Sequence, residues 1–259
     1  MIQTGTQLAA ACEAVAKNYK TLYVNGCFGA PLTESAKSRY TQNTAYNRKP
    51  ERAAKIRAAS ADTFGFDCVC FVKGLLWGWC GDENKVYGGA TYASRGVADL
   101  GEDQLIALSS PSTDFSRVEV GEVLWIPGHM GVYLGNGLAA ECTPAWDDGV
   151  QITAVLNLGK QEGYRGRTWT KHGRLPYLRY EADFALPMYA LRSGSEGAAV
   201  EALQQLLIAK GYTCGSWGAD GQFGAATAQA VKNFQKDRAL DPDGIAGRLT
   251  MAALLGVAL

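Results

Sequence analysis

The sequence predicts an α+β fold for most of the chain, followed by a small three-helix domain. An apolar helix begins near Cys68, strand-like runs follow between residues 123 and 156, and 31 glycines favour the tight turns that join strands. A helix followed by antiparallel strands is the α+β pattern. We therefore expect a first domain over residues 1–182, a connection over 183–190 and a helical domain over 191–259.

The composition argues against some classes of protein. The 259 residues include 25 basic and 25 acidic side chains, so net charge gives no general attraction to nucleic acid or to anionic membranes. No apolar run approaches the roughly 20 residues of a membrane helix, so we expect no membrane insertion. The first residues lack the basic opening of a secretory signal. We expect a protein made in the cytoplasm that stays there until it is released.

The N-terminal part begins with a predicted helix. Thr6 is its expected N-cap, and the residues from Leu8 to Tyr19 supply an apolar face at helical spacing. Residues 23–31 then form an extended segment with a glycine-rich turn. The stretch 33–63 is polar and rich in Lys and Arg, with a helix predicted over residues 51–59. It is either a surface insertion beside a groove or a solvated charged face.

The central part combines one helix with a series of strands. The helix is predicted to begin at Asp67 or Cys68 and to end near Gly81, since apolar residues recur along it at helical spacing. Pro-Gly and Gly-Asn-Gly turns separate the strands that follow. The predicted strands are 123–126, 129–134, 138–143 and 150–156, and residues 169–180 close the domain.

The C-terminal part contains an internal repeat at a spacing of 23 residues. The segment 220–227 matches the segment 243–250 at an aspartate, two glycines and a threonine. Each copy is predicted to be a turn that leads into a helix, and a further helix precedes the first copy. We therefore expect a compact bundle of three short helices without catalytic residues of its own.

Seven cysteines occur, an odd number without C-x-x-C spacing. A chain of this length without a secretory signal is not expected to depend on a disulfide framework. The spacing is also wrong for a structural zinc site. We expect no metal and no organic cofactor.

Cys68 is the candidate nucleophile. A thiol in the first turn of a helix lies near unpaired amides and the positive end of the helix dipole, which lowers its pKa. Asp67 is the predicted N-cap of that helix. Cys70 lies about 200° further round the helix, so it points away and is predicted to be a small buried residue. An inert core cysteine is the other interpretation of Cys68.

His129 is the candidate base, because the chain has only two histidines. It follows a Pro-Gly turn and begins a strand, so its ring projects from one face of the sheet. The second histidine, His172, is predicted to be structural. A cysteine and an imidazole brought together by the fold form a thiol nucleophile site.

Glu141 is the candidate for orienting the imidazole. A two-residue Asn-Gly loop would pair Glu141 with Val132 and turn it away from His129. A three-residue loop over residues 135–137, with its last glycine left-handed, would pair Glu141 with Gly131, on the face of His129. We predict the three-residue loop. A structural glutamate on a solvent face is the other interpretation.

These motifs resemble those of the NlpC-type cysteine peptidases of bacterial cell walls. The resemblance implies a papain-like helix packed on an antiparallel sheet over most of residues 8–180, and cleavage of an amide bond in peptidoglycan stem peptides. It implies Cys68 as nucleophile and His129 as base, with Glu141 as the third polar residue. The matching segments are Asp67-Cys68-Val69-Cys70-Phe71-Val72, Gly121-Glu122-Val123-Leu124-Trp125 and Gly128-His129-Met130-Gly131-Val132-Tyr133-Leu134-Gly135.

The resemblance also bears on substrate binding. A Tyr-x-x-Gly segment upstream of the nucleophile implies Tyr23 as a substrate-binding residue, and Asp67 is a second candidate. The chain departs from the family at Val69 and Cys70, where Ser and Gly usually follow the nucleophile, and an insertion precedes Cys68. These departures affect the expected subsites more than the expected mechanism.

Residues 188–256 resemble the common peptidoglycan-binding domain, with its Asp-Gly-x-Phe-Gly-x-x-Thr motif at 220–227. A cleaving domain joined to a wall-binding domain resembles a phage or prophage endolysin, which acts on the wall after release. Tethering raises the effective concentration of an insoluble substrate. An endopeptidase and an N-acetylmuramoyl-L-alanine amidase both fit. A non-catalytic wall-binding protein and an intracellular papain-like amidase or transferase are the alternatives.

Overall fold

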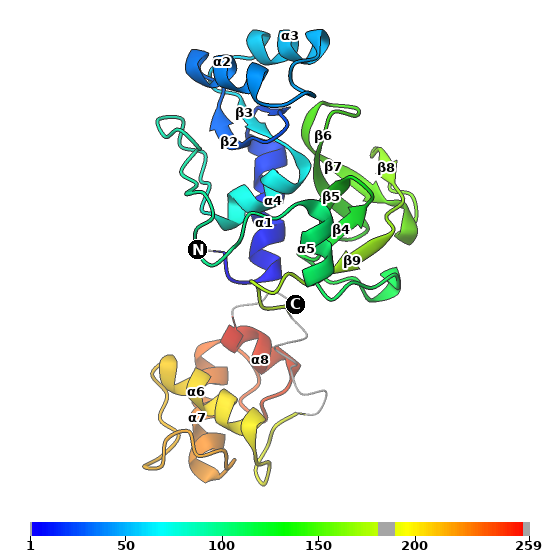
Figure 1. Cartoon of the computed structure of the whole chain (residues 1–259). Helices are drawn as coiled ribbons and strands as arrows, with labels where there is room; N and C mark the ends of the chain where they lie inside the picture. Colours follow the sequence, from blue (N-terminus) through cyan, green and yellow to red (C-terminus); the bar gives the residue numbers. More distant parts are fainter. Residues whose placement is uncertain (1, 181–189, 256–259) are drawn as a thin grey trace. The chain divides into compact units, whose positions relative to one another are not determined.

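The computed structural model describes residues 2–180 and 190–255. The chain divides into two compact units, residues 1–183 and 184–259 (Figure 1). The predicted connection, 183–190, lies outside the described residues except for residue 190. Within the described ranges, every helix is too short or too polar to cross a membrane.

The first unit is a mixed α+β structure, as the sequence predicts. Its helices are α1 (Gly5–Asn18), α2 (Glu34–Asn43), α3 (Pro50–Ala58), α4 (Cys68–Leu76) and α5 (Glu102–Leu108), with 3-10 turns at Phe115–Arg117 and Leu156–Leu158. Its strands are β1 (Thr21–Tyr23), β2 (Phe28–Pro31), β3 (Phe64–Phe66), β4 (Val123–Ile126), β5 (His129–Gly135), β6 (Leu138–Thr143), β7 (Gly149–Val155), β8 (Gly166–Arg167) and β9 (Lys171–Gly173).

The strands form two sheets. A six-stranded sheet has the order β8-β7-β6-β5-β4-β9, and a three-stranded sheet has the order β1-β3-β2. The run from β4 to β7 is the antiparallel meander that the sequence predicts, and β4 and β6 have the predicted bounds. Only β8 joins the large sheet in parallel, beside β7.

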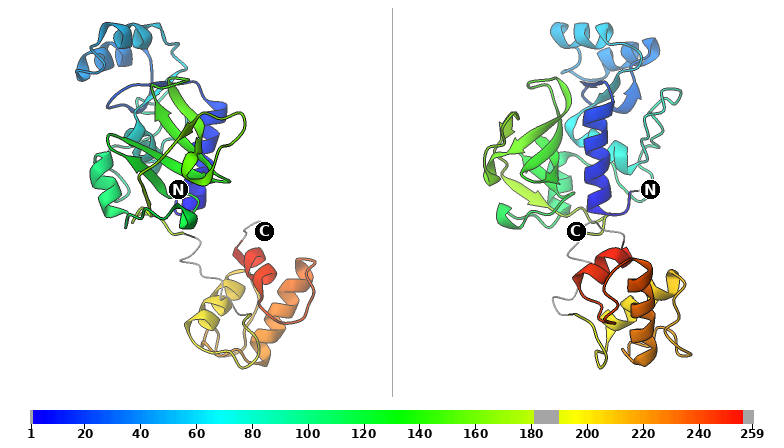
Figure 2. Two further views of the ribbon diagram at one scale, coloured as in Figure 1. Left: turned by 90° about the vertical axis from the view of Figure 1, so that its right-hand side faces the viewer. Right: turned by 180° about the vertical axis from the view of Figure 1, so that it is seen from behind.

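The meander separates two apolar layers, because successive side chains of a strand point to opposite faces. On one face, Met130 and Val132 pack in the main core with α1 and α4. Figure 2 shows α1 and α4 along one side of this sheet. On the other face, Tyr133 and Ala139 pack in a smaller cluster with Trp169.

Residues 33–63 form α2 and α3, which pack against each other (Figure 1). Tyr40 and Ile56 contribute to a small core of their own with residues of the segment 24–32. This stretch therefore has one buried side and one charged, exposed side.

Three predicted details are wrong. The N-cap of α1 is Thr4, whose side chain accepts a hydrogen bond from the Gln7 amide, and Thr6 lies inside the helix. The helix at Cys68 stops at Leu76, well before the predicted Gly81, because Gly78 takes a left-handed φ of +97° that ends the helical path.

The third detail is the hairpin between β5 and β6. Glu141 pairs with Gly131, as predicted, but the turn has two residues, Asn136 and Gly137, both left-handed. The register shifts between Tyr133 and Gly135, so that β5 carries one extra residue. A two-residue turn without a bulge would have paired Glu141 with Val132. The bulge shifts the pairing by one residue and so produces the predicted pair, Glu141 with Gly131.

The second unit has three helices, α6 (Ala198–Ala209), α7 (Ala225–Asp237) and α8 (Arg248–Leu255). Its core is apolar and includes Val200, Leu203, Val231 and Phe234. The repeated motifs are the loops that precede α7 and α8, as the sequence predicts.

Each repeated loop is bound by a buried glutamine of the helix before it. The Gln204 amide nitrogen donates to the Asp220 carboxylate, the Gln222 carbonyl and the Thr227 hydroxyl, while its oxygen accepts from the Gly221 amide. Gln235 repeats every one of these contacts with Asp243, Ile245, Thr250 and Gly244. The positions that match between the two copies therefore have a structural role, which is to fix the turn before each helix.

Candidate active site

Cys68 lies beside β5 and β6 of the large sheet. It is the first residue of α4 and is 6% exposed. The pairing of β5 with β6 begins at Gly131 and Glu141, one residue beyond Met130. The Met130 amide lies close enough to the Cys68 sulfur to favour its thiolate, and Cys142 of β6 lies near the same sulfur. Cys68 is thus beside the backbone of the residue that follows His129.

His129 and Glu141 form a close pair. The His129 Nε2 atom lies 2.6 Å from the Glu141 Oε2 atom, and the Glu141 side chain is completely buried. The pairing of Gly131 with Glu141 brings this about, because it places both side chains on one face of the sheet. Since Nε2 is occupied by the carboxylate, Nδ1 is the ring nitrogen left for other partners.

Two further residues hold the Glu141 carboxylate. Arg167 binds Oε2 through Nε at 3.0 Å and Nη2 at 2.9 Å, and the Thr153 hydroxyl donates to Oε1 at 2.6 Å. Burial alone would raise the pKa of Glu141, but the contacts with His129, Arg167 and Thr153 outweigh it and hold that pKa below its ordinary value. These three contacts therefore keep the buried Glu141 side chain in its ionised form.

Trp169 supports the imidazole from one side. Its ring stacks on the His129 ring at a centroid distance of 5.6 Å and an interplanar angle of 16°. Gly131 makes the space, because a Cβ there would come within 2.9 Å of the Trp169 ring. The absence of a side chain at Gly131 thus admits the indole that fixes the plane of His129.

The electrostatics of Cys68 differ from the prediction. Burial, and next the nearby Asp67 carboxylate, raise the pKa of the Cys68 thiol to about 12, although the amides of Met130 and Val69 act in the opposite direction. The expected lowering by the helix start is therefore outweighed by desolvation. The neutral thiol is the resting form at neutral pH.

Asp67 is the N-cap that the sequence predicts. One carboxylate oxygen accepts from the Cys70 amide at 2.7 Å, and the other accepts from the Gly26 amide at 2.7 Å. Burial raises the pKa of this group, which is 5% exposed. Both oxygens are used to fix the helix start and the preceding turn, so the geometry gives no support to the predicted contact of Asp67 with substrate.

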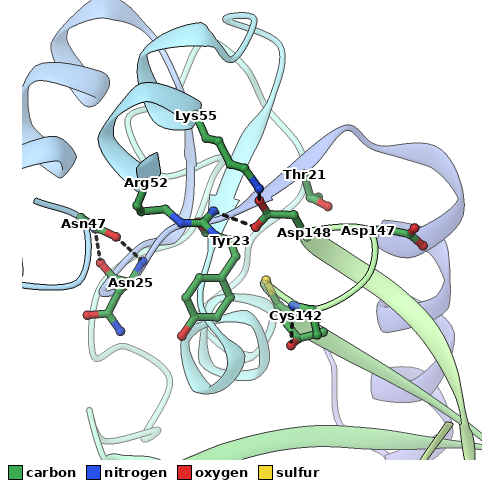
Figure 3. Close-up of polar contacts among 12 residues, drawn as sticks. Thr21, Tyr23, Asn25, Asn47, Arg52, Lys55, Cys142, Asp147 and Asp148 are labelled. Carbon is green, nitrogen blue, oxygen red and sulfur yellow. Dashed lines mark hydrogen bonds and ion pairs between the residues drawn. The ribbon is translucent and has the colours of Figure 1, made fainter. Parts of the chain in front are cut away.

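Tyr23 lies near the candidate nucleophile. Burial, and next the proximity of Cys68 and Asp67, raise the pKa of its phenol. Figure 3 shows Tyr23 at the end of β1, in the same region as Cys142 and Asp148. This position is compatible with the predicted contact between Tyr23 and substrate, which stays a prediction.

Cys70 and His172 have the structural positions that the sequence predicts. Cys70 belongs to the main core and is 9% exposed. His172 is buried, with Nδ1 bound to the Glu122 carboxylate and Nε2 at 3.0 Å from the Asp114 carbonyl oxygen. Among residues 2–180 and 190–255, no group of three or more His, Cys, Asp or Glu side chains is arranged to hold a metal ion.

Sequence reasoning missed Arg167, Thr153 and Trp169. Thr153 could have been found by pairing the predicted strand 150–156 with 138–143, because it then falls on the face of Glu141. Arg167 and Trp169 alternate along the chain, but β8 has only two residues. No local pattern in the sequence predicts that this segment joins the sheet.

Comparison with known protein families gives a match within the second unit. Residues 196–254 match the family model described as "Putative peptidoglycan binding domain". The chain is 43% identical over 67 residues to the N-acetylmuramoyl-L-alanine amidase CwlL of Bacillus licheniformis, and 41% identical over 64 residues to a probable N-acetylmuramoyl-L-alanine amidase of the same organism. These alignments cover 26% and 25% of this chain and 19% and 18% of the relatives, so the chain spans about a fifth of their length.

Among solved structures, the chain is 42% identical to a Burkholderia AP3 phage endolysin, over 26% of this chain and 24% of that one, with a TM-score of 0.24. It is 35% identical to the SleB N-terminal domain, over 28% of this chain and 96% of that one, with a TM-score of 0.26. The chain therefore contains a peptidoglycan-binding domain over residues 196–254, and the two curated relatives are named as an N-acetylmuramoyl-L-alanine amidase and a probable one.

Proposed function

We propose that this protein is a peptidoglycan hydrolase that cleaves an amide bond of the stem peptide with Cys68, His129 and Glu141. The observation that carries the proposal is the pair of His129 on β5 and the fully buried Glu141 on β6, 2.6 Å apart, with the backbone of Met130, the residue after His129, beside Cys68. The peptidoglycan-binding domain at residues 196–254 supports the choice of substrate.

The proposed reaction begins with proton transfer from the Cys68 thiol to His129. The His129 Nε2 atom is hydrogen-bonded to the Glu141 carboxylate, so Nδ1 is the nitrogen that accepts the proton. Because the resting thiol is neutral, His129 acts as a general base while the sulfur attacks the carbonyl carbon of the amide. Glu141 stabilises the imidazolium that forms.

The tetrahedral intermediate carries a negative charge on the former carbonyl oxygen. The amides at the start of α4 are the candidate donors to this oxygen. His129 then gives its proton to the leaving amine, and the C–N bond breaks to leave a thioester on Cys68. Water hydrolyses the thioester, releases the carboxylate and restores the thiol. No metal or organic cofactor takes part.

The papain-like character of the first unit is part of this proposal. It is supported by a helix that begins at Cys68 and packs on β5 and β6, the two strands that carry His129 and Glu141. The biological setting that we propose is that of an endolysin, which is made inside a host cell and reaches the wall after release.

The test is replacement of Cys68 by Ala. Lysis of purified sacculi should fall by about 10³-fold or more, because no nucleophile remains, while the variant should still sediment with the sacculi. The matched control is Cys80→Ala, which removes an exposed cysteine outside the site and should leave lysis unchanged. Full lytic activity in the Cys68→Ala variant would rule out the proposal and leave a non-catalytic role for the thiol.

The bond that is cut has two candidates. We favour a bond within the stem peptide, and an N-acetylmuramoyl-L-alanine amidase is the second candidate, favoured by the names of the two Bacillus licheniformis relatives. Mass spectrometry of the released muropeptides separates them. New amino groups on an internal stem residue support the endopeptidase, and new amino groups on the first alanine alone support the amidase.

A further inference from the structure

The loop between β6 and β7 has an unusual backbone. Within residues 144–148, Trp146 has a φ of +55° and Asp148 a φ of +56°. A bulky side chain rarely adopts this left-handed region, and such residues persist only where surrounding contacts hold them. The loop is therefore kept in its conformation by other parts of the fold.

The contacts that hold the loop come from the stretch of residues 33–63. Arg52 of α3 binds the Asp148 carboxylate at 2.7 Å, and Lys55 of the same helix binds its other oxygen at 2.5 Å. Figure 3 shows both cations meeting this carboxylate. The Arg52 side chain is 7% exposed and that of Asp148 14%, so the ion pair is largely shielded from solvent.

A second set of contacts fixes the backbone of the loop. The Asp148 carbonyl oxygen accepts from the Tyr23 amide at 3.1 Å. The Gln151 side chain donates to the Ala145 carbonyl oxygen at 3.0 Å. The loop is thus bound on one side to α3 and β1 and on the other to its own strand β7.

This fixed loop presents Trp146 to Arg167, which binds Glu141. The Trp146 ring lies 5.2 Å from the Arg167 guanidinium carbon, and Arg167 binds the same Glu141 oxygen as His129. The Trp146 side chain remains 42% exposed. An indole that packs on Arg167, the partner of Glu141, and is partly exposed elsewhere offers an apolar surface to whatever adjoins the bond that is cut.

We propose that Trp146 contacts the amino-acid residues that adjoin the scissile amide, and that the Arg52–Asp148 ion pair positions it. The proposal rests on the proposed function, because it assigns a substrate contact to the same site. It gives the stretch of residues 33–63 a role in substrate selection. The occupant of the Trp146 face is the peptide part of the substrate, whose aliphatic carbons pack on the indole.

The first test is the kinetics of Trp146→Ala on two soluble substrates, a stem peptide alone and the same peptide carrying its disaccharide. KM should rise about tenfold for both substrates with little change in kcat, since the reacting groups are intact. Trp146→Phe should retain most of the affinity. Tyr164→Ala is the matched control, because Tyr164 is another exposed aromatic residue of the first unit, at 45% exposure.

Two outcomes of this test would overturn the proposal. An unchanged KM for both substrates would show that the indole makes no contact. A rise for the disaccharide-bearing substrate alone would assign the Trp146 face to the sugar. Both outcomes are distinct from failure of the proposed function, in which Cys68→Ala would cleave these substrates as fast as the unmodified protein.

The second test concerns the ion pair and needs no activity. Protein labelled with 5-fluorotryptophan should give one 19F resonance for each of the six tryptophans, and Trp146→Phe assigns one of them. Arg52→Gln and Asp148→Asn should each shift or broaden that resonance and raise KM in parallel with Trp146→Ala. Lys17→Gln, which breaks an exposed ion pair on α1, should leave both unchanged. A Trp146 resonance that stays unmoved in both ion-pair variants would contradict the positioning role.

Discussion

The two units bury polar side chains of different kinds. In the first unit the buried polar groups include charged residues, among them Glu141, His172 and Lys73. In the described part of the second unit they are Gln204, Thr227, Gln235 and Thr250, all of them neutral. A buried charge is unfavourable unless partners compensate for it, whereas a buried amide needs only its hydrogen bonds.

On the proposed function, this difference separates a unit that carries out the reaction from a unit whose buried polar groups only stabilise its loops. In the first unit, Arg167 and Thr153 keep Glu141 ionised beside an imidazole. In the second unit, Gln204 and Gln235 hold turns and leave the surface free for binding. The comparison predicts that removing the buried carboxylate that binds His129 should lower activity strongly, whereas removing a buried glutamine of the second unit should affect only stability.

The largest effect is expected from Glu141→Gln. The amide keeps the shape of the side chain but not its charge, so the imidazolium loses its stabilising partner and Arg167 is left without a counter-charge. We expect kcat/KM to fall by about 10²- to 10⁴-fold, as for other triads that lose their carboxylate. The measurement is cleavage of a soluble stem peptide, with Glu13→Gln, an exposed carboxylate on α1, as the control. A loss of less than threefold would show that the buried charge is not part of the reaction.

A smaller effect is expected from Gln204→Ala in the second unit. The variant loses the hydrogen bonds to Asp220, Thr227 and the loop backbone and leaves buried groups unpaired, which should cost about 2–4 kcal/mol of unfolding free energy. Cleavage of a soluble peptide should be unchanged. The adjacent Gln205→Ala is the matched control, because that side chain is exposed and bonded only to Glu201. Equal stability of the two variants, measured by urea unfolding, would contradict the structural role of the buried glutamine.

The smallest effect is a dependence of stability on pH in the first unit. Burial alone would lower the pKa of His172, but its contacts with Glu122 and with the Asp114 carbonyl oxygen outweigh burial and raise it above 6.5. Because the folded form binds the proton more tightly, this stabilisation is complete below about pH 6.5 and is lost as pH rises through the raised pKa. The urea midpoint of the first unit should therefore fall over that interval. His172→Gln should remove this component, and a midpoint that changes with pH equally in both proteins would refute the assignment.

The sequence predicts the strands of the meander well because their alternating pattern and turns are local. The bounds of β4 and β6 and the pairing of Glu141 with Gly131 follow from residues close in the chain. The position of Arg167 does not, because a two-residue strand joins the sheet only through tertiary contacts. The pKa of Cys68 was predicted in the wrong direction for a similar reason, since desolvation depends on everything packed around the sulfur.

In the C-terminal repeat, the sequence predicts the turns but not the side chains that hold them. The matching residues at a spacing of 23 predict two equivalent turns, and the structure contains them. The sequence does not reveal the glutamines that bind these turns, because Gln204 and Gln235 lie outside the repeat, each on the preceding helix. Their spacing of 31 residues differs from that of the motif. Because the two glutamines do not recur at the spacing of the motif, the repeat gives no sign of them.

The extra residue in β5 allows this strand to lose a residue without a change of register at the site. Deleting Leu134 would remove the bulge and join Tyr133 directly to Gly135, so Tyr133 would still pair with Ala139 and Gly131 with Glu141. Regular pairing of every residue of β5, with Leu134 kept, would instead place Glu141 opposite Val132 and direct its carboxylate to the sheet face opposite His129. Over evolutionary time, the loss of one residue from this part of β5 should therefore be tolerated, because the bulge holds a residue that the register does not need.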